Sequence, residues 1–129
     1  MIFVDSSYLI ALAITNDKWH GKAKKLRKIV EKEEKILTTL NMAETIALIS
    51  YKGNLEAAVF FYKYIKENYK IIDTTLDLCD KSLEKFIKYN GTLSTADVVA
   101  LEVMENKNIG KIVSFDSDFD KVEDIIRIH

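Results

Sequence analysis

Four acidic residues stand apart from the other charged residues of this chain. Each lies within or at the end of an apolar stretch that contains no other charged side chain: Asp5, Glu44, Asp97 and Asp116. An unpaired charge is expensive at the edge of a buried region, and two carboxylates ~4 Å apart repel by about 4 kcal/mol at protein-like screening. If the four side chains share one pocket, protons or a cation must offset this repulsion.

The chemistry of the acidic set selects the cation. An all-oxygen set without Cys or His favours hard divalent ions, so we expect Mg²⁺ or Mn²⁺. Such an ion orients a water, lowers the pKa of that water and stabilises charge on a phosphate. The four acids therefore predict hydrolysis of a phosphodiester.

Each acid, taken alone, also has a structural interpretation. Acidic residues favour the first turn of a helix, because they accept hydrogen bonds from free N–H groups and complement the helix dipole. Glu44 fits a capping box that begins at Asn41, and Asp97 fits the first turn after Ser94 or Thr95. Two acids at strand ends and two in helix first turns nevertheless fit one rim of one sheet, and this joint pattern favours a shared site.

Strands that alternate with pairs of helices would position these acids. We expect strands at residues 2–4, 36–37, 71–72 and 112–115, and an edge strand at 125–128. We expect helices at residues 8–14, 18–32, 41–51, 55–68, 75–89 and 96–106. The alternation predicts one α/β domain over residues 1–129 with a mainly parallel central sheet flanked by helices. Asp5 and Asp116 then lie at carboxyl ends of strands, where such sheets place ligands.

Composition narrows the function classes. The net charge is −1, so no global field attracts nucleic acid. No apolar run is long enough to span a bilayer, and residues 1–14 lack the features of a signal peptide, so we expect a cytoplasmic protein with no membrane partner. There is no glycine-rich phosphate loop, which argues against a nucleotide-binding protein of the P-loop type. There is no Gly-x-Ser-x-Gly elbow, which argues against a Ser-His-Asp hydrolase. His20 and His129 lack metal-ligand spacing, and Cys79, the single cysteine, is expected in the core.

Two surface features each allow two interpretations. Residues 18–35 are mostly basic, and they form either a solvated helix face or a flank that contacts phosphates. The helix at residues 55–68 carries one apolar stripe that includes Ala58 and Ile65, and a second stripe, Phe60, Phe61 and Tyr64, on roughly the opposite side. A helix that is apolar on two faces is either deeply buried or bound to a partner, and for so small a chain we favour the partner.

Four short motifs surround the acids. They are Val4-Asp5-Ser6-Ser7, Asn41-Met42-Ala43-Glu44-Thr45, Ser94-Thr95-Ala96-Asp97 and the run from Ser114 to Asp120. In order and spacing they resemble the PIN-domain ribonuclease family, and more closely its small VapC-type toxins, over essentially the whole chain.

The resemblance implies a metal-dependent endoribonuclease whose acidic site is Asp5, Glu44, Asp97 and Asp116. It also implies that Asp118 is a weaker, supplementary metal ligand, and that Ser6 and Ser114 steady water or carboxylate. The family's toxins are usually homodimers that a small antitoxin protein neutralises, which offers a use for the second apolar stripe.

Two other functions remain open from the residues themselves. A non-catalytic binding module of the same fold would use the acids only as caps. A divalent-metal nuclease that acts on DNA would share the acidic site and differ only in substrate.

Overall fold

Short runs of aliphatic residues form a five-stranded sheet. The computed structural model describes residues 1–129, and its strands are β1 (Ile2–Val4), β2 (Lys35–Thr38), β3 (Lys70–Ile72), β4 (Lys111–Val113) and β5 (Ile126–Ile128). All four pairings are parallel. β1 is buried along its whole length, as an apolar run without alternation predicts. The prediction of an α/β fold with a mainly parallel sheet is confirmed, since every strand pair is parallel.

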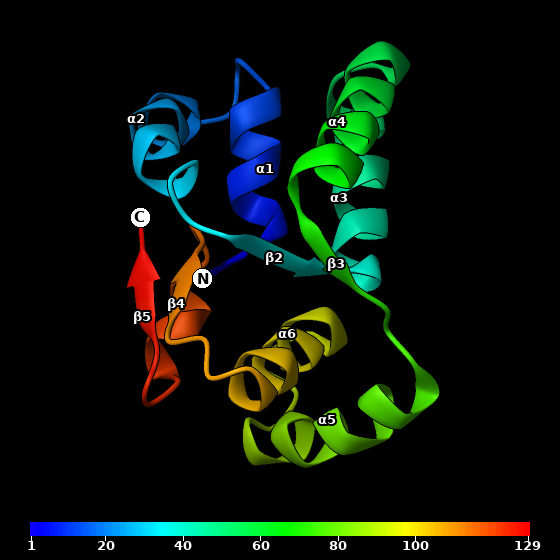
Figure 1. The fold of residues 1–129 in the computed structure, drawn as a ribbon, viewed down its shortest axis with the longest axis vertical. Helices are drawn as coiled ribbons and strands as arrows, with labels where there is room; N and C mark the ends of the chain where they lie inside the picture. The colour runs from blue at the N-terminus through cyan, green and yellow to red at the C-terminus, as the bar shows by residue number, and fades with distance from the viewer.

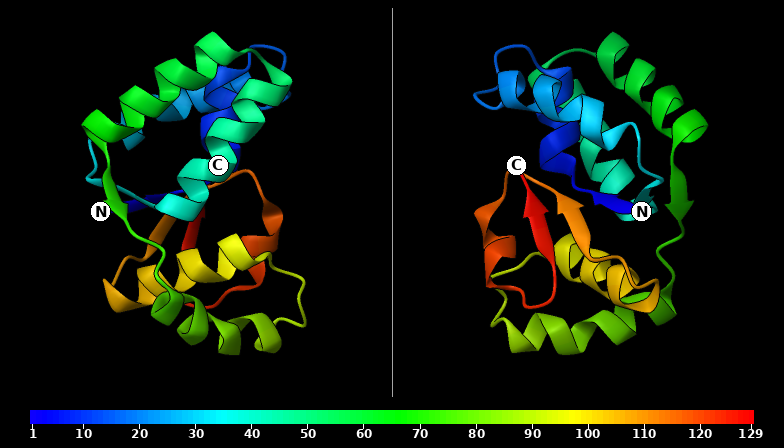
Figure 2. Two further views of the ribbon diagram at one scale, coloured as in Figure 1. Left: turned by 90° about the vertical axis from the view of Figure 1, so that its right-hand side faces the viewer. Right: turned by 60° about the vertical axis from the view of Figure 1, so that its left-hand side comes forward.

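Six helices cover the two faces of the sheet. They are α1 (Ser6–Ala13), α2 (His20–Val30), α3 (Thr39–Lys52), α4 (Leu55–Asn68), α5 (Leu76–Lys88) and α6 (Thr95–Asn106). Helices α1 to α4 lie on one side and α5 and α6 on the other (Figure 1), and the two turned views agree (Figure 2). A 3-10 helix, η1 (Ser117–Lys121), connects β4 to β5. None of the helices has the length and apolar character needed to cross a membrane.

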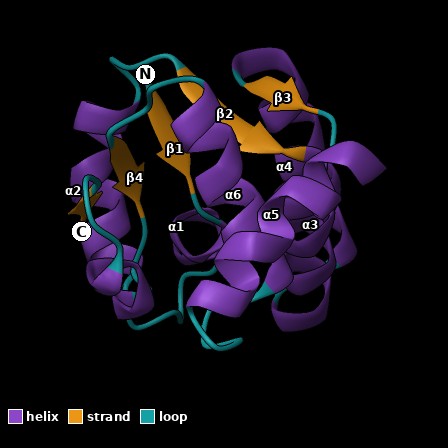
Figure 3. Ribbon diagram, turned by 90° about the horizontal axis from the view of Figure 1, so that it is seen from below, coloured by secondary structure: helices purple, strands orange, loops and turns teal.

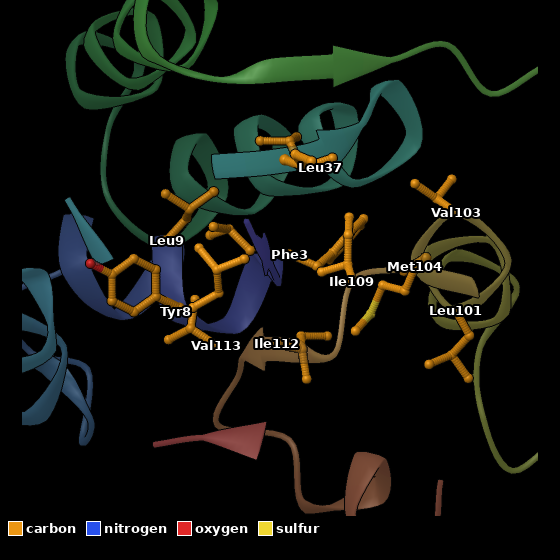
Figure 4. Packing of buried hydrophobic residues seen from close by; sticks show 14 of the residues in the cluster. Phe3, Tyr8, Leu9, Leu37, Leu101, Val103, Met104, Ile109, Ile112 and Val113 are labelled. Carbon is orange, nitrogen blue, oxygen red and sulfur yellow. The ribbon is translucent and has the colours of Figure 1, made fainter. Parts of the chain in front are cut away.

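The core fills the space between the sheet and both helical layers. Tyr8 and Leu9 of α1 pack on one side of the strands, and Leu101 and Met104 of α6 pack on the other (Figure 4). Phe3 of β1 lies between these groups and is fully buried. Helices therefore pack against the central strands from both faces, and this packing holds the ends of those strands in place.

The strand order reverses beside β1. The order across the sheet is β3-β2-β1-β4-β5, so the chain builds outward from β1 through β2 to β3 and then returns to place β4 on the other side of β1 (Figure 3). Open α/β sheets bind ligands in the crevice outside the carboxyl ends of the strands at such a reversal. Asp5 follows β1 and Ser114 follows β4, so both lie at this crevice.

Two helices begin earlier than the sequence pattern predicts. Helix α1 begins at Ser6, because Asp5 itself caps it, and α3 begins at Thr39 with Thr38 as its cap. The prediction that Asn41 caps this helix is wrong. Asn41 lies within α3, where its backbone N–H donates to Thr38 Oγ1 (3.1 Å) and the residue is buried. β2 runs into α3 without a loop, so the last strand residue becomes the cap.

The apolar surface of α4 divides differently from the two predicted stripes. Ala58 and Ile65 are buried, Phe61 and Tyr64 are half-buried, and Phe60 is 63% exposed. The core-facing surface therefore combines members of both stripes. Only Phe60 of the proposed partner stripe projects mainly into solvent.

Cys79 is exposed, which corrects its predicted place in the core. The face of α5 that is buried carries Leu78 and Ser82 instead. The buried face of α5 is therefore centred on Leu78 and Ser82, and Cys79 lies outside it.

Candidate active site

Asp5 is the most buried of the four acids, with 5% of its surface exposed. Its Oδ2 accepts hydrogen bonds from the Ser7 N–H (3.3 Å), Ser7 Oγ (2.6 Å) and Ser114 Oγ (2.8 Å). Burial raises the pKa of Asp5, and the charge of Asp116 adds to this rise, while the serine hydrogen bonds oppose it. The three donors all bind one oxygen, so this carboxylate is firmly oriented while Oδ1 accepts no hydrogen bond from the protein.

Two serines join the ends of β1 and β4. Ser114 is fully buried, and its Oγ also accepts the Asp116 backbone N–H (3.0 Å). Ser7 Oγ lies 3.2 Å from Ser114 Oγ and accepts the Phe115 N–H (2.9 Å). The sequence motifs indicated a supporting role for Ser114, but they gave none to Ser7. The missed signal was its position two residues after a helix cap, where the backbone N–H bonds to the capping side chain.

Asp97 lies in the first turn of α6 and has both a capping and an electrostatic role. It forms a reciprocal capping box with Ser94: each side chain accepts the backbone N–H of the other residue, at 3.1 Å. Partial burial and, to a smaller extent, the charges of Asp5 and Asp116 raise the pKa of Asp97 to about 6, and the hydrogen bonds with Ser94 oppose this rise. The structural interpretation of Asp97 is therefore correct, yet the residue also faces two other acids.

Glu44 approaches from α3. Ser6 Oγ donates to Glu44 Oε2 at 3.4 Å, and Ser6 itself is buried. Partial burial raises the pKa of Glu44, and the charge of Asp5 adds to the rise. Since α3 begins at Thr39, Glu44 is beyond its first turn and is not part of a capping box. Its carboxylate is thus not needed as a helix cap and can take part in the acidic group around Asp5.

The acids after β4 divide into an inner and an outer set. Asp116 is half-buried and caps η1 by accepting the Asp118 N–H (2.9 Å). The Asp118 carboxylate is 52% exposed and pairs with Lys121 at 3.5 Å. Asp120 binds Arg127 through both oxygens (2.8 Å each), and this hydrogen bonding lowers the pKa of Asp120. Asp118 and Asp120 are therefore engaged by cations of the chain, in contrast to Asp116.

The four predicted acids form one electrostatic group. Asp5 raises the pKa of Asp97 and of Glu44, and Asp116 raises the pKa of Asp5 and of Asp97. No three acidic, His or Cys side chains lie close enough together to hold an ion as they stand. The donor set fits a hard divalent cation, because it is all oxygen and Oδ1 of the buried Asp5 accepts no hydrogen bond from the protein. Burial first, and the neighbouring acids second, disfavour the charged forms of Asp5, Glu44 and Asp97, and a cation would offset both effects.

Known proteins are similar to this chain along most of its length. A family model described as PIN domain matches residues 2–125. Ribonuclease VapC6 of Methanocaldococcus jannaschii is 31% identical over 95% of this chain and 92% of its own length. The 23S rRNA-specific endonuclease VapC20 of Mycobacterium tuberculosis is 30% identical over 92% of both chains.

Solved structures share the fold. The crystal structure of Mycobacterium tuberculosis VapC20, described as a sarcin–ricin loop cleaving toxin, superimposes with a TM-score of 0.85 at 25% identity and covers 97% of each chain. A chain of VapBC2 from Rickettsia felis, solved with a fragment of promoter DNA, has a TM-score of 0.71 at 12% identity, covers 99% of this chain and 98% of its own, and supports the fold alone.

Proposed function

This chain belongs to the PIN-domain family, and we propose that it is a metal-dependent endoribonuclease, the toxin of a toxin–antitoxin pair. One observation carries the proposal: four acids, at the caps of α1 and η1 and within α3 and α6, lie near the reversal point of the sheet, where the charges of Asp5 and Asp116 help to raise the pKa of neighbouring acids. The 30% and 31% identical relatives, both named as ribonucleases, support the reaction class.

Three aspartates would hold a Mg²⁺ or Mn²⁺ ion: Asp5, Asp97 and Asp116. Glu44 would complete the set directly or through a water, and Asp118 would contribute only after release from Lys121. A bound ion of this kind supplies an activated water and stabilises charge on a phosphate. Ser7 and Ser114 hold Oδ2 of Asp5 and leave its Oδ1 free, and Ser6 steadies Glu44.

Ribosomal RNA is the first substrate to test. The relative from Mycobacterium tuberculosis is named as specific for 23S rRNA, and its structure is described as cleaving the sarcin–ricin loop. We extend that substrate class to this chain as a proposal, because the similarity covers 92% of both sequences. The enzyme would then act in the cytoplasm, where ribosomes lie.

A small antitoxin protein and a second copy of the chain are the proposed protein partners. Exposed Phe60 on α4 adjoins a groove of about 240 Å³ lined by apolar and basic side chains, among them Leu12, Lys24 and Arg27. A groove lined by both apolar and basic side chains suits an acidic amphipathic segment of a partner.

The decisive experiment is RNA cleavage by the purified chain with Mn²⁺, with Mg²⁺ and with EDTA. The substrates are total bacterial ribosomal RNA and a synthetic sarcin–ricin hairpin, with a DNA hairpin of the same sequence beside them. We expect cleavage of RNA only, only with metal, and none with Asp97→Asn, which keeps the capping box but removes the charge. Cleavage that persists in the variant would indicate a contaminant, and cleavage of DNA instead would replace the substrate class.

A further inference from the structure

An aromatic pair lies beside the acidic group. The Trp19 indole stacks on the Phe115 ring, with centroids 5.3 Å apart and planes inclined by 7°. Phe115 stands between Ser114 and Asp116 in the chain, and its backbone N–H donates to Ser7 Oγ. The stack is therefore attached directly to the network that orients Asp5.

Two lysines lie over the same indole. The Nζ atoms of Lys18 and Lys22 are 5.1 Å and 5.2 Å from the Trp19 ring centroid, within range of a cation–π interaction. Both lysines are exposed, and neither has a carboxylate within ion-pair distance. Lys121 and Arg127, by contrast, are paired with Asp118 and Asp120.

Hydrogen bonds hold this segment in place. The Trp19 backbone N–H donates to Asp17 Oδ1 (2.8 Å). His20 Nδ1 lies 2.7 Å from the Ala11 carbonyl oxygen, and since a carbonyl can only accept, the imidazole donates. The start of α2 is thus fixed to α1, and the indole is positioned before any ligand arrives. A preorganised site of this kind loses less entropy on binding.

Electrostatics indicate what the two lysines bind. The chain has a net charge of −1 and its active site is acidic, so neither attracts RNA. Two ammonium groups near one ring, neither of them paired with a carboxylate, form a local positive charge that attracts a phosphate. The indole faces are already occupied by Phe115 and the lysines, so the site favours a phosphate over a stacked base.

We propose that Lys18 and Lys22, held on the Trp19–Phe115 stack, bind a backbone phosphate of the RNA close to the phosphate that is cleaved. This inference rests on the proposed ribonuclease function and adds the substrate-positioning residues. It also divides the basic segment at residues 18–35 into two parts. The first part binds the phosphate, and the rest is exposed to solvent, since Lys25 and Lys28 contact no aromatic ring and lie farther along α2.

The test measures binding of the sarcin–ricin RNA hairpin to the chain with Asp97→Asn, so that binding is separated from cleavage. Into this background we introduce Lys18→Gln with Lys22→Gln, and as a matched control Lys25→Gln with Lys28→Gln. Both pairs remove two positive charges from exposed positions of the same region. The measurement is Kd over a range of salt concentrations.

We expect the first pair to raise Kd on the order of tenfold and to reduce the slope of log Kd against log salt by about 0.7 to 1, as for one lost phosphate contact. The control pair should change Kd less than about twofold. Equal effects of the two pairs would overturn the inference while leaving the ribonuclease proposal intact. Specific binding without metal-dependent cleavage by the unaltered chain would instead remove the ribonuclease proposal and keep the phosphate contact, and no binding would remove both.

Discussion

Ser114 Oγ donates a 2.8 Å hydrogen bond to Asp5 Oδ2, across 109 residues of sequence. The same hydroxyl accepts the Asp116 backbone N–H at 3.0 Å. One buried serine therefore orients the carboxylate at the end of β1 and the backbone of the acid that follows β4. The acidic group depends on this contact, because it joins the two strands at the reversal of the sheet.

Loss of that hydroxyl should weaken both the fold and the reaction. Ser114→Ala removes a donor to a buried carboxylate, so we expect a loss of about 1 to 3 kcal/mol in the free energy of unfolding, measured by urea denaturation. The pKa of Asp5 would rise further, and RNA cleavage at neutral pH should fall on the order of tenfold. Ser117→Ala, at an exposed position of η1, serves as control and should change neither quantity. Full activity in Ser114→Ala would argue that Asp5 needs no such orientation.

Asp97→Asn should stabilise the metal-free protein. The raised pKa of about 6 means that the folded state binds the Asp97 proton more tightly than the unfolded state, whose value is near 3.8. The ionised carboxylate therefore destabilises the fold, fully above pH 6 and not below about pH 3.8. Allowing for partial exposure, we expect a gain of about 1 to 2 kcal/mol at pH 7.5 in EDTA, which fades toward pH 4. A large loss of stability would instead mean that the charged carboxylate of Asp97 stabilises the fold in a way that Asn cannot replace.

Metal affinity should fall in acid. Below about pH 6 Asp97 takes up a proton, and because a ligating carboxylate must be deprotonated, affinity should drop by at least about tenfold per pH unit. Burial raises the pKa of Asp5 and Glu44 as well, so the decline should be steeper than for one group. Calorimetric titration with Mn²⁺ between pH 5 and pH 8 measures this. A constant affinity over that range would exclude these carboxylates as ligands.

A divalent ion should raise the thermal stability of the intact site only. At a free ion concentration of 100 times Kd, binding contributes about 2.7 kcal/mol, or several degrees in Tm. We expect this shift in the unaltered chain and in Asp80→Asn, an exposed acid of α5, but not in Asp5→Asn. Equal shifts in all three proteins would mean that the ion binds elsewhere.

Phe60→Glu should alter assembly more than stability. Phe60 is 63% exposed, so its replacement should lower Tm by only a few degrees while it weakens antitoxin binding or changes the species seen in gel filtration. Phe61→Glu is expected to unfold the protein at lower temperature instead, because Phe61 packs against Ile10, Ile49 and Ala58. Leu83→Glu, at an exposed apolar position of α5, controls for a general surface effect. Unchanged assembly in Phe60→Glu would remove this residue from the proposed interface.

The sequence alone determined the elements and the identity of the acids. An apolar run without alternation predicted the buried parallel strand at Ile2–Val4, and the spacing of helices and strands predicted the α/β fold. Charge-free surroundings singled out Asp5, Glu44, Asp97 and Asp116, because a charge near the core stands out in a local pattern. Ser94 and Asp97 were predictable as a cap, since a capping box involves residues only three apart.

Only the tertiary structure decided how these parts meet. Whether β4 lies beside β1 depends on packing of whole helices against the sheet, so no local pattern could predict that Ser114 bonds to Asp5 or that Ser7 links them. The same limit explains why Cys79 is exposed and why α4 buries parts of both apolar stripes: the inward face of a helix is set by its neighbours. The stack of Trp19 on Phe115 joins residues 96 positions apart in the sequence, and only the fold places the indole against the residue that precedes Asp116.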